Sequence, residues 1–450
     1  MRVLIHLWST FLQDPLLKKV IRNTGYLFSS TSVSLVLGLV QSILAARMLG
    51  VYTFGILGTV TVYASTVNRL FSFRMTELVV KYLGQFTIEN QKDRAAAVVK
   101  VAALAEAATS TLALIFLFLL AEPAARLILK DPQIAPWIRI YGLSILGTIV
   151  METSTGVLHV GDQFRGQAWV NLAQSVFTAA IIVILFFSGG DLLGVLLAYL
   201  FGKIILGVGT AVLALRKLHH MLGPGWWRAS FNLLPPFKEL SRFTISTNLS
   251  QTVMLFVRDS ELIWISFFLS PLEAGYYKVV LAIINLACMP ITPLISTTYP
   301  EINRSVAARN WPQLRHLLRQ VTFLSGGWTL ITLLGCILFG NWLIQFYGPE
   351  YLPAYPALIV LLIGYGMANT FFWNRPLLLS FGKPMVPFQA SLWPGLAKVA
   401  LAFLVVPVYG YVGEAVLLSS YFLVSITWIA LKGFEEIRKA EHAGFAGGTV

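Results

Sequence analysis

Residues 243–304 read FTISTNLSQTVMLFVRDSELIWISFFLSPLEAGYYKVVLAIINLACMPITPLISTTYPEINR. The stretch holds two apolar segments joined by a very short turn, and each is long enough to cross the roughly 30 Å hydrocarbon core of a bilayer as a helix. Large polar or charged side chains interrupt these runs: Asn248, Gln251, Arg258, Asp259, Glu261, Lys278 and Asn285. A charge at bilayer depth costs roughly 2.5–3.5 kcal/mol on insertion scales, so such residues indicate a functional site. The stretch therefore predicts a helical membrane protein with a charged site inside its bundle.

The composition of the whole chain is that of a membrane protein. Of its 450 residues, 57% are hydrophobic and 12% are charged, and the mean hydropathy is +0.74. Soluble domains carry about 25% charged residues. The apolar runs are continuous over about twenty residues, which favours helices over the short alternating strands of a barrel. The sequence therefore predicts an all-α polytopic membrane protein.

Several classes of function lack their sequence signals. The formal net charge is +13, but the Lys and Arg lie between the hydrophobic spans and form no single basic stripe, which excludes nucleic-acid binding. Cys288 and Cys336 both fall inside expected spans, and the pair His219–His220 has no third ligand nearby, so neither a disulfide framework nor a metal site is expected. No GxxxxGK[ST] loop is present, so the chain does not hydrolyse ATP itself.

We expect twelve spans in two lobes of six. Their ranges are 24–46, 54–74, 96–121, 135–158, 169–188, 191–215, 243–268, 275–299, 321–346, 355–379, 386–408 and 412–431. They divide the chain into an N-terminal segment 1–23, an N-lobe 24–215, a linker 216–242, a C-lobe 243–431 and a tail 432–450. With the N-terminus inside, the loops place 25 Lys and Arg on the cytoplasmic side and four outside. The positive-inside rule therefore places both termini and the linker in the cytoplasm.

The two halves of the chain resemble each other. LGVYTFGILGTVTV at 49–62 corresponds to LSPLEAGYYKVVLAI at 269–283, so that Gly55 matches Gly275. FRGQAWVNLAQ at 164–174 corresponds to FGKPMVPFQAS at 381–391, so that Gly166 matches Gly382. The offsets of 220 and 216 residues are similar, which predicts an internal repeat, a common plan among transporters.

Helical spacing places polar residues on one face in each of the four spans that open the two halves. These faces include Ser34 and Gln41, Thr59 and Thr66, Asn248 and Arg258, and Lys278 and Asn285. The simplest arrangement points the faces at a shared, water-accessible cavity. The alternative is that they hydrogen-bond across helices, or form structural ion pairs, and only hold the bundle together. Isolated charges elsewhere are Glu106, Glu152, Lys203 and Lys398, of which either glutamate is suited to carry a coupling proton.

Three groups of motifs occur in order along nearly the whole chain. The first half has AARMLGVYTFGILG at 45–58. The second half has Asp259, then Gly275-Tyr276-Tyr277 and Pro300-Glu301, followed by Gly382-Lys383-Pro384 and PVYGYVG at 407–413. In this ordered set the chain resembles the polysaccharide-transport branch of the multidrug/oligosaccharidyl-lipid/polysaccharide (MOP) exporter superfamily, the O-antigen and capsule-type flippases. Glu414 departs from the small residue that is usual at that position.

The resemblance implies a MATE-like fold with a central cationic cavity in a bacterial inner membrane. It also implies a non-enzymatic activity: flipping an undecaprenyl-diphosphate-linked oligosaccharide from the cytoplasmic to the outer leaflet by alternating access, for surface polysaccharide synthesis. A diphosphate suits Arg and Lys, and amides and hydroxyls suit sugars. The expected substrate-binding residues are Arg258, Lys278, Asn248, Gln251 and Asn285, with Arg47, Arg74, Lys81 and Arg375 as charges at a gate or entrance. The expected counter-charges or ion-coupling groups are Asp259, Glu261, Glu77 and Glu152.

No cofactor or metal is expected, and the resemblance is compatible with a coupling H⁺ or Na⁺. The expected partners are the lipid-linked oligosaccharide, membrane lipid, and a polysaccharide polymerase with other assembly proteins. Two other functions stay open. A drug/cation antiporter of the same superfamily needs an acidic cavity, and resistance to cationic dyes identifies it. A membrane-embedded polysaccharide polymerase or ligase needs a large outside loop, whereas every expected outside loop is short.

Overall fold

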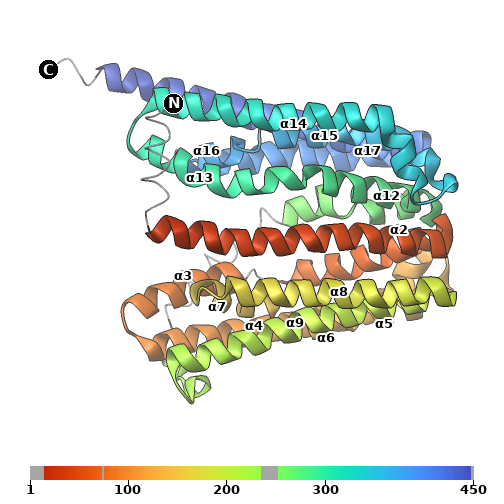
Figure 1. Cartoon of the computed structure of the whole chain (residues 1–450), viewed down its shortest axis with the longest axis horizontal. Helices are drawn as coiled ribbons and strands as arrows, with labels where there is room; N and C mark the ends of the chain where they lie inside the picture. The colour runs from red at the N-terminus through yellow and green to blue at the C-terminus, as the bar shows by residue number, and fades with distance from the viewer. Residues whose placement is uncertain (1–14, 73–74, 235–251, 447–450) are drawn as a thin grey trace. The chain divides into compact units, whose positions relative to one another are not determined.

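The computed structural model describes residues 15–72, 75–234 and 252–446, with side chains placed in these ranges between Ser32 and His442 except at 293, 296 and 297. Every regular element in the described residues is a helix, and no strand occurs among them (Figure 1). The all-helical prediction is therefore confirmed. A helix satisfies its backbone polar groups within its own segment, which lipid-exposed chain requires.

Nine helical runs in the described residues are long and apolar enough to cross a membrane. Two of them, Ser32–Phe71 and Met385–His442, bend at a glycine, and each covers two of the expected spans. The bends lie at Gly50 (φ 70°) and Gly410 (φ 65°), in a left-handed region that glycine enters at little cost. The described chain thus contains eleven of the twelve expected spans, and the remaining one, 243–268, lies partly outside the described residues.

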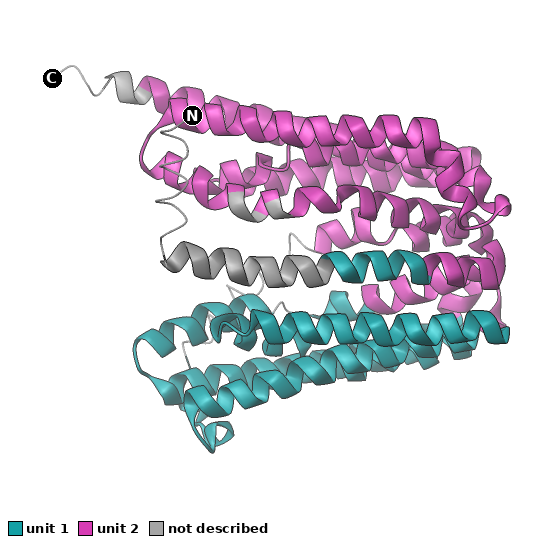
Figure 2. Ribbon diagram, in the orientation of Figure 1, with its two compact units in different colours: residues 1–41, 67–122, 135–249 teal, residues 42–66, 123–134, 250–450 magenta. Residues whose placement is uncertain are grey.

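The chain forms two compact units, coloured separately in Figure 2. The first consists of Met1–Gln41, Val67–Glu122 and Ala135–Leu249. Its elements are the two ends of α2 (Pro15–Phe71), α3 (Met75–Ile88), most of α4 (Lys92–Leu127), α5 (Ala135–Gly142), α6 (Ser144–Gly147), α7 (Met151–Val160), α8 (Phe164–Ser188), α9 (Leu192–Leu222), η2 (Trp226–Arg228) and η3 (Phe231–Leu233). Apolar side chains of α3, α4, α7 and α9 form its buried core, among them Leu83, Val99, Val157 and Leu218.

The fourth expected span of the first unit is broken into three pieces. α5 ends at Gly142, α6 is a single turn, and α7 begins at Met151. The irregular backbone lies directly against α9, because a Cβ built on Gly207 would lie 1.9 Å from the carbonyl oxygen of Gly147. The break leaves the N–H groups at the start of α7 without partners in their own helix.

The second unit consists of Ser42–Thr66, Pro123–Ile134 and Ser250–Val450. Besides residues 42–66 of α2, its elements are η1 (Pro132–Ile134), η4 (Leu255–Asp259), α11 (Glu261–Phe268), α12 (Pro271–Cys288), η5 (Met289–Ile291), α13 (Thr292–Ala307), α14 (Trp311–Gln345), η6 (Pro349–Ala354), α15 (Tyr355–Thr370), α16 (Asn374–Ser380) and α17 (Met385–Ala446). One part of its core joins α13, α14, α16 and α17 around the fully buried Trp373.

Residues 42–66 and α12 approach each other closely at two glycines in the second unit. A Cβ on Gly55 would lie 1.7 Å from the carbonyl oxygen of Pro271, and a Cβ on Gly275 would lie 2.2 Å from that of Val51. Small residues at such crossings allow helix backbones in membranes to touch. Gly55 and Gly275 are also counterparts in the repeat inferred from the sequence, so the two equivalent residues meet at one crossing.

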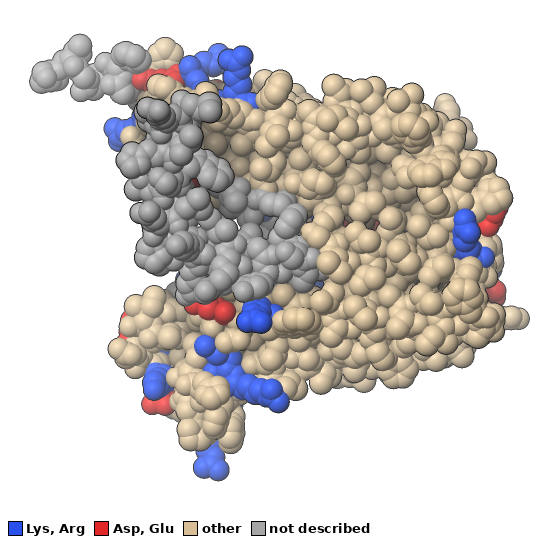
Figure 3. All heavy atoms as spheres, viewed as in Figure 1, with Lys and Arg blue, Asp and Glu red and all other residues tan. Residues whose placement is uncertain are grey.

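The surface of the helices suits a lipid environment. On the face drawn in Figure 3, the described charged side chains lie near the ends of the helices, and other residues cover the surface between them. Large apolar side chains are exposed along the helices, including Leu119, Phe187, Phe323 and Leu338. Contact with hydrocarbon removes the cost that such exposure carries in water.

Candidate functional site

The centre of the candidate site is a short distorted segment of the second unit, η4. Residues Leu255–Asp259 form a π-helical turn, a geometry that is rare and is frequent at functional sites. Side chains bond to the backbone carbonyls of this turn. Trp264 Nε1 donates to the carbonyl oxygen of Phe256 over 3.1 Å, and Lys398 Nζ donates to that of Val257 over 2.8 Å. These bonds hold the distorted backbone in place where regular helix bonds are weakened.

Arg258 is the cation that η4 presents. Its Nε donates to Asp259 Oδ1 over 2.8 Å, and 42% of its side chain is exposed, against 19% for Asp259. A guanidinium carries five N–H donors in a rigid fork. Among the described residues, the bond to Asp259 uses Nε and leaves the terminal nitrogens for an incoming acceptor. Arg258 is therefore a partly exposed cation whose terminal N–H groups have no acceptor among the described residues.

A buried ion cluster lies beneath η4. Lys398 Nζ of α17 is bonded to Glu414 Oε1 and lies 3.7 Å from Glu261 Oε1. The side chains of Lys398, Glu261 and Glu414 are 3%, 1% and 0% exposed. Attraction between Lys398 and the two carboxyl groups offsets part of the desolvation cost that a buried ion carries alone.

Neither Lys398 nor Glu414 is among the site residues predicted from the sequence. In the sequence Lys398 is an isolated charge and Glu414 is a departure from a family pattern. The available signal was that both occur on neighbouring expected spans with opposite charge, since an unpaired ion inside a membrane is costly and calls for a partner. Lys398 bonds both to Glu414 and to the carbonyl oxygen of Val257 in η4. It therefore supports the turn that carries Arg258.

Lys278 lies on α12 and contacts residues 51–66 of α2. Its Nζ is 3.9 Å from the centroid of the Phe54 ring and donates to the Phe54 carbonyl oxygen over 3.4 Å. Its stem covers Gly58, where an added Cβ would lie 2.7 Å from Lys278 Cδ. An ammonium over an aromatic face is stabilised by about 2 kcal/mol when it is shielded from water. Lys278 thus has an established intramolecular partner.

The other predicted binding residues are spread over several elements. Arg47 donates to the carbonyl oxygens of Phe346 and Gln345, at the end of α14, so it satisfies a helix C-terminus. Asn285 is exposed on α12, Arg375 is half-buried on α16, and Lys81 on α3 is exposed beside Tyr82. Three of the predicted residues, Arg74, Asn248 and Gln251, lie outside the described residues.

The acidic residues predicted in the first half gather at the broken fourth span. Glu106 of α4 accepts the backbone N–H of Glu152 through Oε1 and that of Thr153 through Oε2, both over 2.8 Å. Thr76 Oγ1 of α3 donates to Glu152 Oε2 over 2.6 Å. Glu106 therefore satisfies N–H groups that the break leaves open at the start of α7, and Glu152 ties α7 to α3. Glu77, the neighbour of Thr76, is half-buried.

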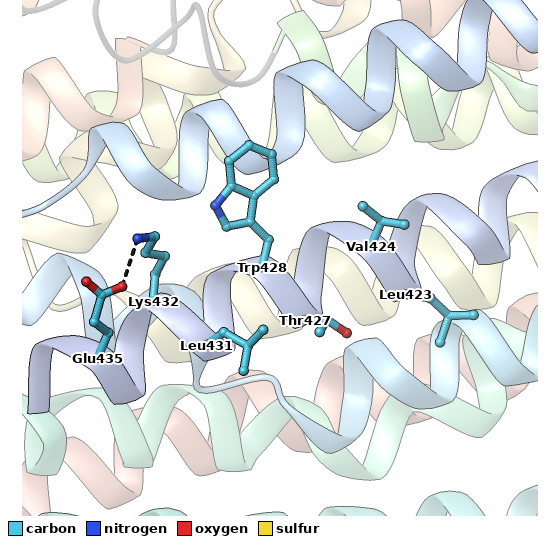
Figure 4. Close-up of a pocket in the computed structure, with 7 residues that line it drawn as sticks. All are labelled: Leu423, Val424, Thr427, Trp428, Leu431, Lys432 and Glu435. Carbon is cyan, nitrogen blue, oxygen red and sulfur yellow. Dashed lines mark hydrogen bonds and ion pairs between the residues drawn. The ribbon is translucent and has the colours of Figure 1, made fainter. Parts of the chain in front are cut away.

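Two cavities differ in chemistry. The larger one, about 560 Å³, is a groove along the last part of α17, lined by Leu423, Val424, Thr427, Trp428, Leu431, Lys432 and Glu435 (Figure 4). Its lining is mostly apolar, and its two charges pair with each other over 2.7 Å. The smaller one, about 330 Å³, lies in the first unit between α2 and α8 and is lined by Ser34, Leu35, Gln41, Asn171, Gln174 and Ser175. Only the smaller cavity offers several convergent polar groups, which specific small-molecule sites require.

Comparison with known proteins matches this architecture. The family described as polysaccharide biosynthesis protein matches residues 20–306. Inner membrane protein YghQ of Escherichia coli (strain K12) is 24% identical over 344 residues, which cover 76% of this chain and 96% of that protein.

Solved structures share the fold. An inward-facing multidrug resistance MATE family transporter of the MOP superfamily has a TM-score of 0.70 at 12% identity, covering 91% of this chain and 96% of that one. The lipid II flippase MurJ, in an inward closed conformation, has a TM-score of 0.67 at 16% identity, covering 91% and 89%. The chain therefore belongs to the polysaccharide biosynthesis protein family and has the fold of transporters of the MOP superfamily.

Proposed function

We propose that the protein is a flippase that moves undecaprenyl-diphosphate-linked oligosaccharides from the cytoplasmic to the outer leaflet of a bacterial inner membrane by alternating access. The observation that carries the proposal is Arg258, a partly exposed guanidinium on a distorted turn that a buried ion cluster supports. The family description names polysaccharide biosynthesis, and one structural neighbour is a flippase of a lipid. These three observations support the proposal of an anionic lipid-linked saccharide as substrate.

In this proposal Arg258 binds the diphosphate. Asp259 neutralises the guanidinium while the site is empty, and the phosphate oxygens replace or join that carboxylate through the terminal nitrogens. Lys278 supplies a second charge when its ammonium leaves the Phe54 ring. Asn285, and Asn248 and Gln251 outside the described residues, are proposed to contact the substrate. Arg47, Arg74, Lys81 and Arg375 are proposed as charges at a gate or entrance.

The acidic residues are proposed to balance these cations or to couple transport to H⁺ or Na⁺. Glu261 balances a further cation, Lys398, whose Nζ lies 3.7 Å away in a buried cluster. Asp259, Glu77 and Glu152 complete this proposed set. Both chain termini are proposed to be cytoplasmic, and a polysaccharide polymerase and other assembly proteins are proposed as partners.

The test replaces Arg258 in cells and follows the lipid-linked repeat units and the surface polysaccharide. Arg258→Ala should cut polysaccharide export by roughly 10-fold or more, because a charge-assisted hydrogen bond contributes about 1.5–3 kcal/mol. Arg258→Lys should retain part of the activity, since it keeps the charge and loses the fork. The control is Lys439→Ala, which removes an exposed cation at the end of α17. Normal export by Arg258→Ala at normal protein level would rule out this site.

A drug/cation antiporter is the second candidate, because a multidrug resistance transporter shares the fold. The more exposed of the two charges on η4 is a cation, which opposes binding of cationic drugs. Resistance to cationic dyes on overexpression, with unchanged surface polysaccharide, would favour the antiporter.

A further inference from the structure

The polar cavity of the first unit has the chemistry of a sugar site. It measures about 330 Å³, near the lower end of the roughly 300–1,000 Å³ typical of small-molecule pockets. Uncharged polar side chains form most of its lining, and none of its lining residues is ionisable: Ser34, Leu35 and Gln41 from α2, and Asn171, Gln174 and Ser175 from α8. The absence of charge in the lining disfavours a phosphate group or a cation as the occupant.

Two amides of the cavity are held in fixed orientations. Gln41 is 7% exposed, and its Nε2 donates to the backbone carbonyl of Ser175 over 3.0 Å. Gln174 Nε2 donates to Thr178 Oγ1 over 3.1 Å, one turn further along α8. Fixed amides are characteristic of recognition sites, because a ligand then meets donors and acceptors that are already positioned.

Other polar groups of the cavity have unused hydrogen-bonding capacity. Ser34 Oγ is buried and has no hydrogen-bond partner among the described residues. The Asn171 side chain makes no hydrogen bond to any described residue. A hydroxyl and an amide each donate and accept, as the hydroxyls of a sugar do. Leu35 adds an apolar wall that suits the C–H groups of a sugar ring.

Simple adhesion between helices accounts poorly for this arrangement, because polar residues that only join helices pair with each other and fill the space between them. By helical spacing Gly38 lies on the same face of α2 as Ser34 and Gln41. A Cβ on Gly38 would meet no atom within 4 Å, so space is left beside the polar groups.

We propose that this cavity is a subsite for one neutral sugar residue of the transported oligosaccharide. The proposal rests on the proposed function. Gly38 keeps the subsite open, the amides of Gln41 and Gln174 select hydroxyl groups, and Asn171 and Ser34 supply the unpaired donors and acceptors.

The test uses purified protein in detergent and three probes. The first is the lipid-linked oligosaccharide that accumulates in cells lacking this protein, the second is the free oligosaccharide released from it by mild acid, and the third is undecaprenyl diphosphate without sugars. Gly38→Leu adds a large side chain on the face of α2 that carries Ser34 and Gln41, at a position where a Cβ meets no atom within 4 Å, and Asn171→Leu removes an amide of the lining. The matched controls are Gly38→Ala and Val176→Leu, the latter on an exposed part of α8.

Gly38→Leu and Asn171→Leu should bind the first probe at least 10-fold more weakly, lose binding of the second, and bind the third like the wild type. The controls should match the wild type throughout. Unchanged binding of the first probe by both variants would overturn the subsite and leave the flippase proposal standing. Equal weakening for the third probe would also overturn it, because the cavity would then act only through the fold. A wild-type protein that fails to bind the first probe would overturn both proposals.

Discussion

Lys398 is a single buried cation that faces two carboxyl groups at once. It is bonded to Glu414, lies 3.7 Å from Glu261, and donates to the carbonyl oxygen of Val257. All three ionisable side chains are buried. Removing the cation leaves two buried carboxylates facing each other, a far larger loss than that of an exposed ion pair.

Lys398→Met should destabilise the protein by about 3–5 kcal/mol, because it leaves uncompensated buried charge. Adding Glu414→Gln should recover part of the loss, since the double variant removes a cation and an anion together. The measurement is thermal unfolding in detergent for the two variants and the wild type. Equal stability of Lys398→Met and the wild type would contradict the described cluster.

Two substitutions separate a binding role of Lys278 from a structural one. Phe54→Leu removes the aromatic partner of the ammonium and keeps its charge, whereas Lys278→Met removes the charge and keeps the stem over Gly58. If Lys278 binds phosphate, export should fall at least several-fold for Lys278→Met and stay near normal for Phe54→Leu. Export of lipid-linked repeat units at matched protein levels measures this, and equal losses in both variants would show a structural role.

At the scale of helices, close backbone contacts decide which elements pack. Gly55 and Gly275 let residues 42–66 of α2 touch α12, with distances that no side chain larger than a hydrogen atom permits. The same segment is tied to α11 by a 2.6 Å hydrogen bond between Thr59 Oγ1 and Ser266 Oγ. These contacts explain why residues 42–66 join the second unit.

Gly275→Val should force these helices apart and destabilise the second unit by about 1–3 kcal/mol or more, as overpacking does. Gly84→Val on α3 is the control, because a Cβ there meets no atom within 4 Å. Thermal unfolding and the protein level in the membrane are the measurements. A Gly275→Val protein as stable as the Gly84→Val protein would disprove the close crossing.

The broken fourth span depends on Glu106. Its two carboxylate oxygens each accept one N–H from the start of α7. Glu106→Gln leaves one acceptor for two donors and should cost about 1–3 kcal/mol, the penalty for an unpaired buried polar group. Asp93→Asn, an exposed change on the same helix, should cost less than about 1 kcal/mol. Denaturation in detergent compares the two, and similar small losses would argue against the capping role.

At the scale of the whole molecule, each compact unit is built from several separate segments of the chain. Residues 42–66 and 123–134 belong by contacts to the second unit although they come from the first half of the sequence. Two sequence halves related by a repeat therefore do not correspond one to one with two compact bodies. Tyr351 Oη, for example, donates to the carbonyl oxygen of Ala46 over 3.0 Å. Such contacts hold residues 42–66 within the second unit.

The positive-inside rule predicts the topology of the whole chain. Reporter fusions test it: alkaline phosphatase joined after residues 130, 190 or 350 should be active outside the cytoplasm, and after 90, 228 or 446 it should be inactive. A fluorescent protein that folds only in the cytoplasm should give the reverse pattern. Activity of alkaline phosphatase after residue 446 would contradict the even number of spans and the cytoplasmic C-terminus.

Some features of the protein were predictable because they are local properties of the chain. Apolar runs of about twenty residues predict membrane helices wherever they occur, and the predicted boundaries between spans include Gly50 and Gly410, where the structure has a positive φ that glycine adopts readily. The charges near Arg258 were found because each ion in an apolar run is costly by itself. None of these inferences requires knowing what a residue touches.

The sequence by itself determined the helical class, the span boundaries and the costly charges, and the tertiary structure decided which groups are partners. Lys398 pairs with Glu261 across 137 positions of the chain and Glu106 with the N–H of Thr153 across 47, while Lys278 faces Phe54 from 224 positions away. A partner at such separation depends on how helices pack, because packing, and not spacing along one helix, brings the side chains within a few ångströms. In the stretch 243–304, the charges were evident from the sequence, and only the tertiary structure showed which partner each of the described charges has.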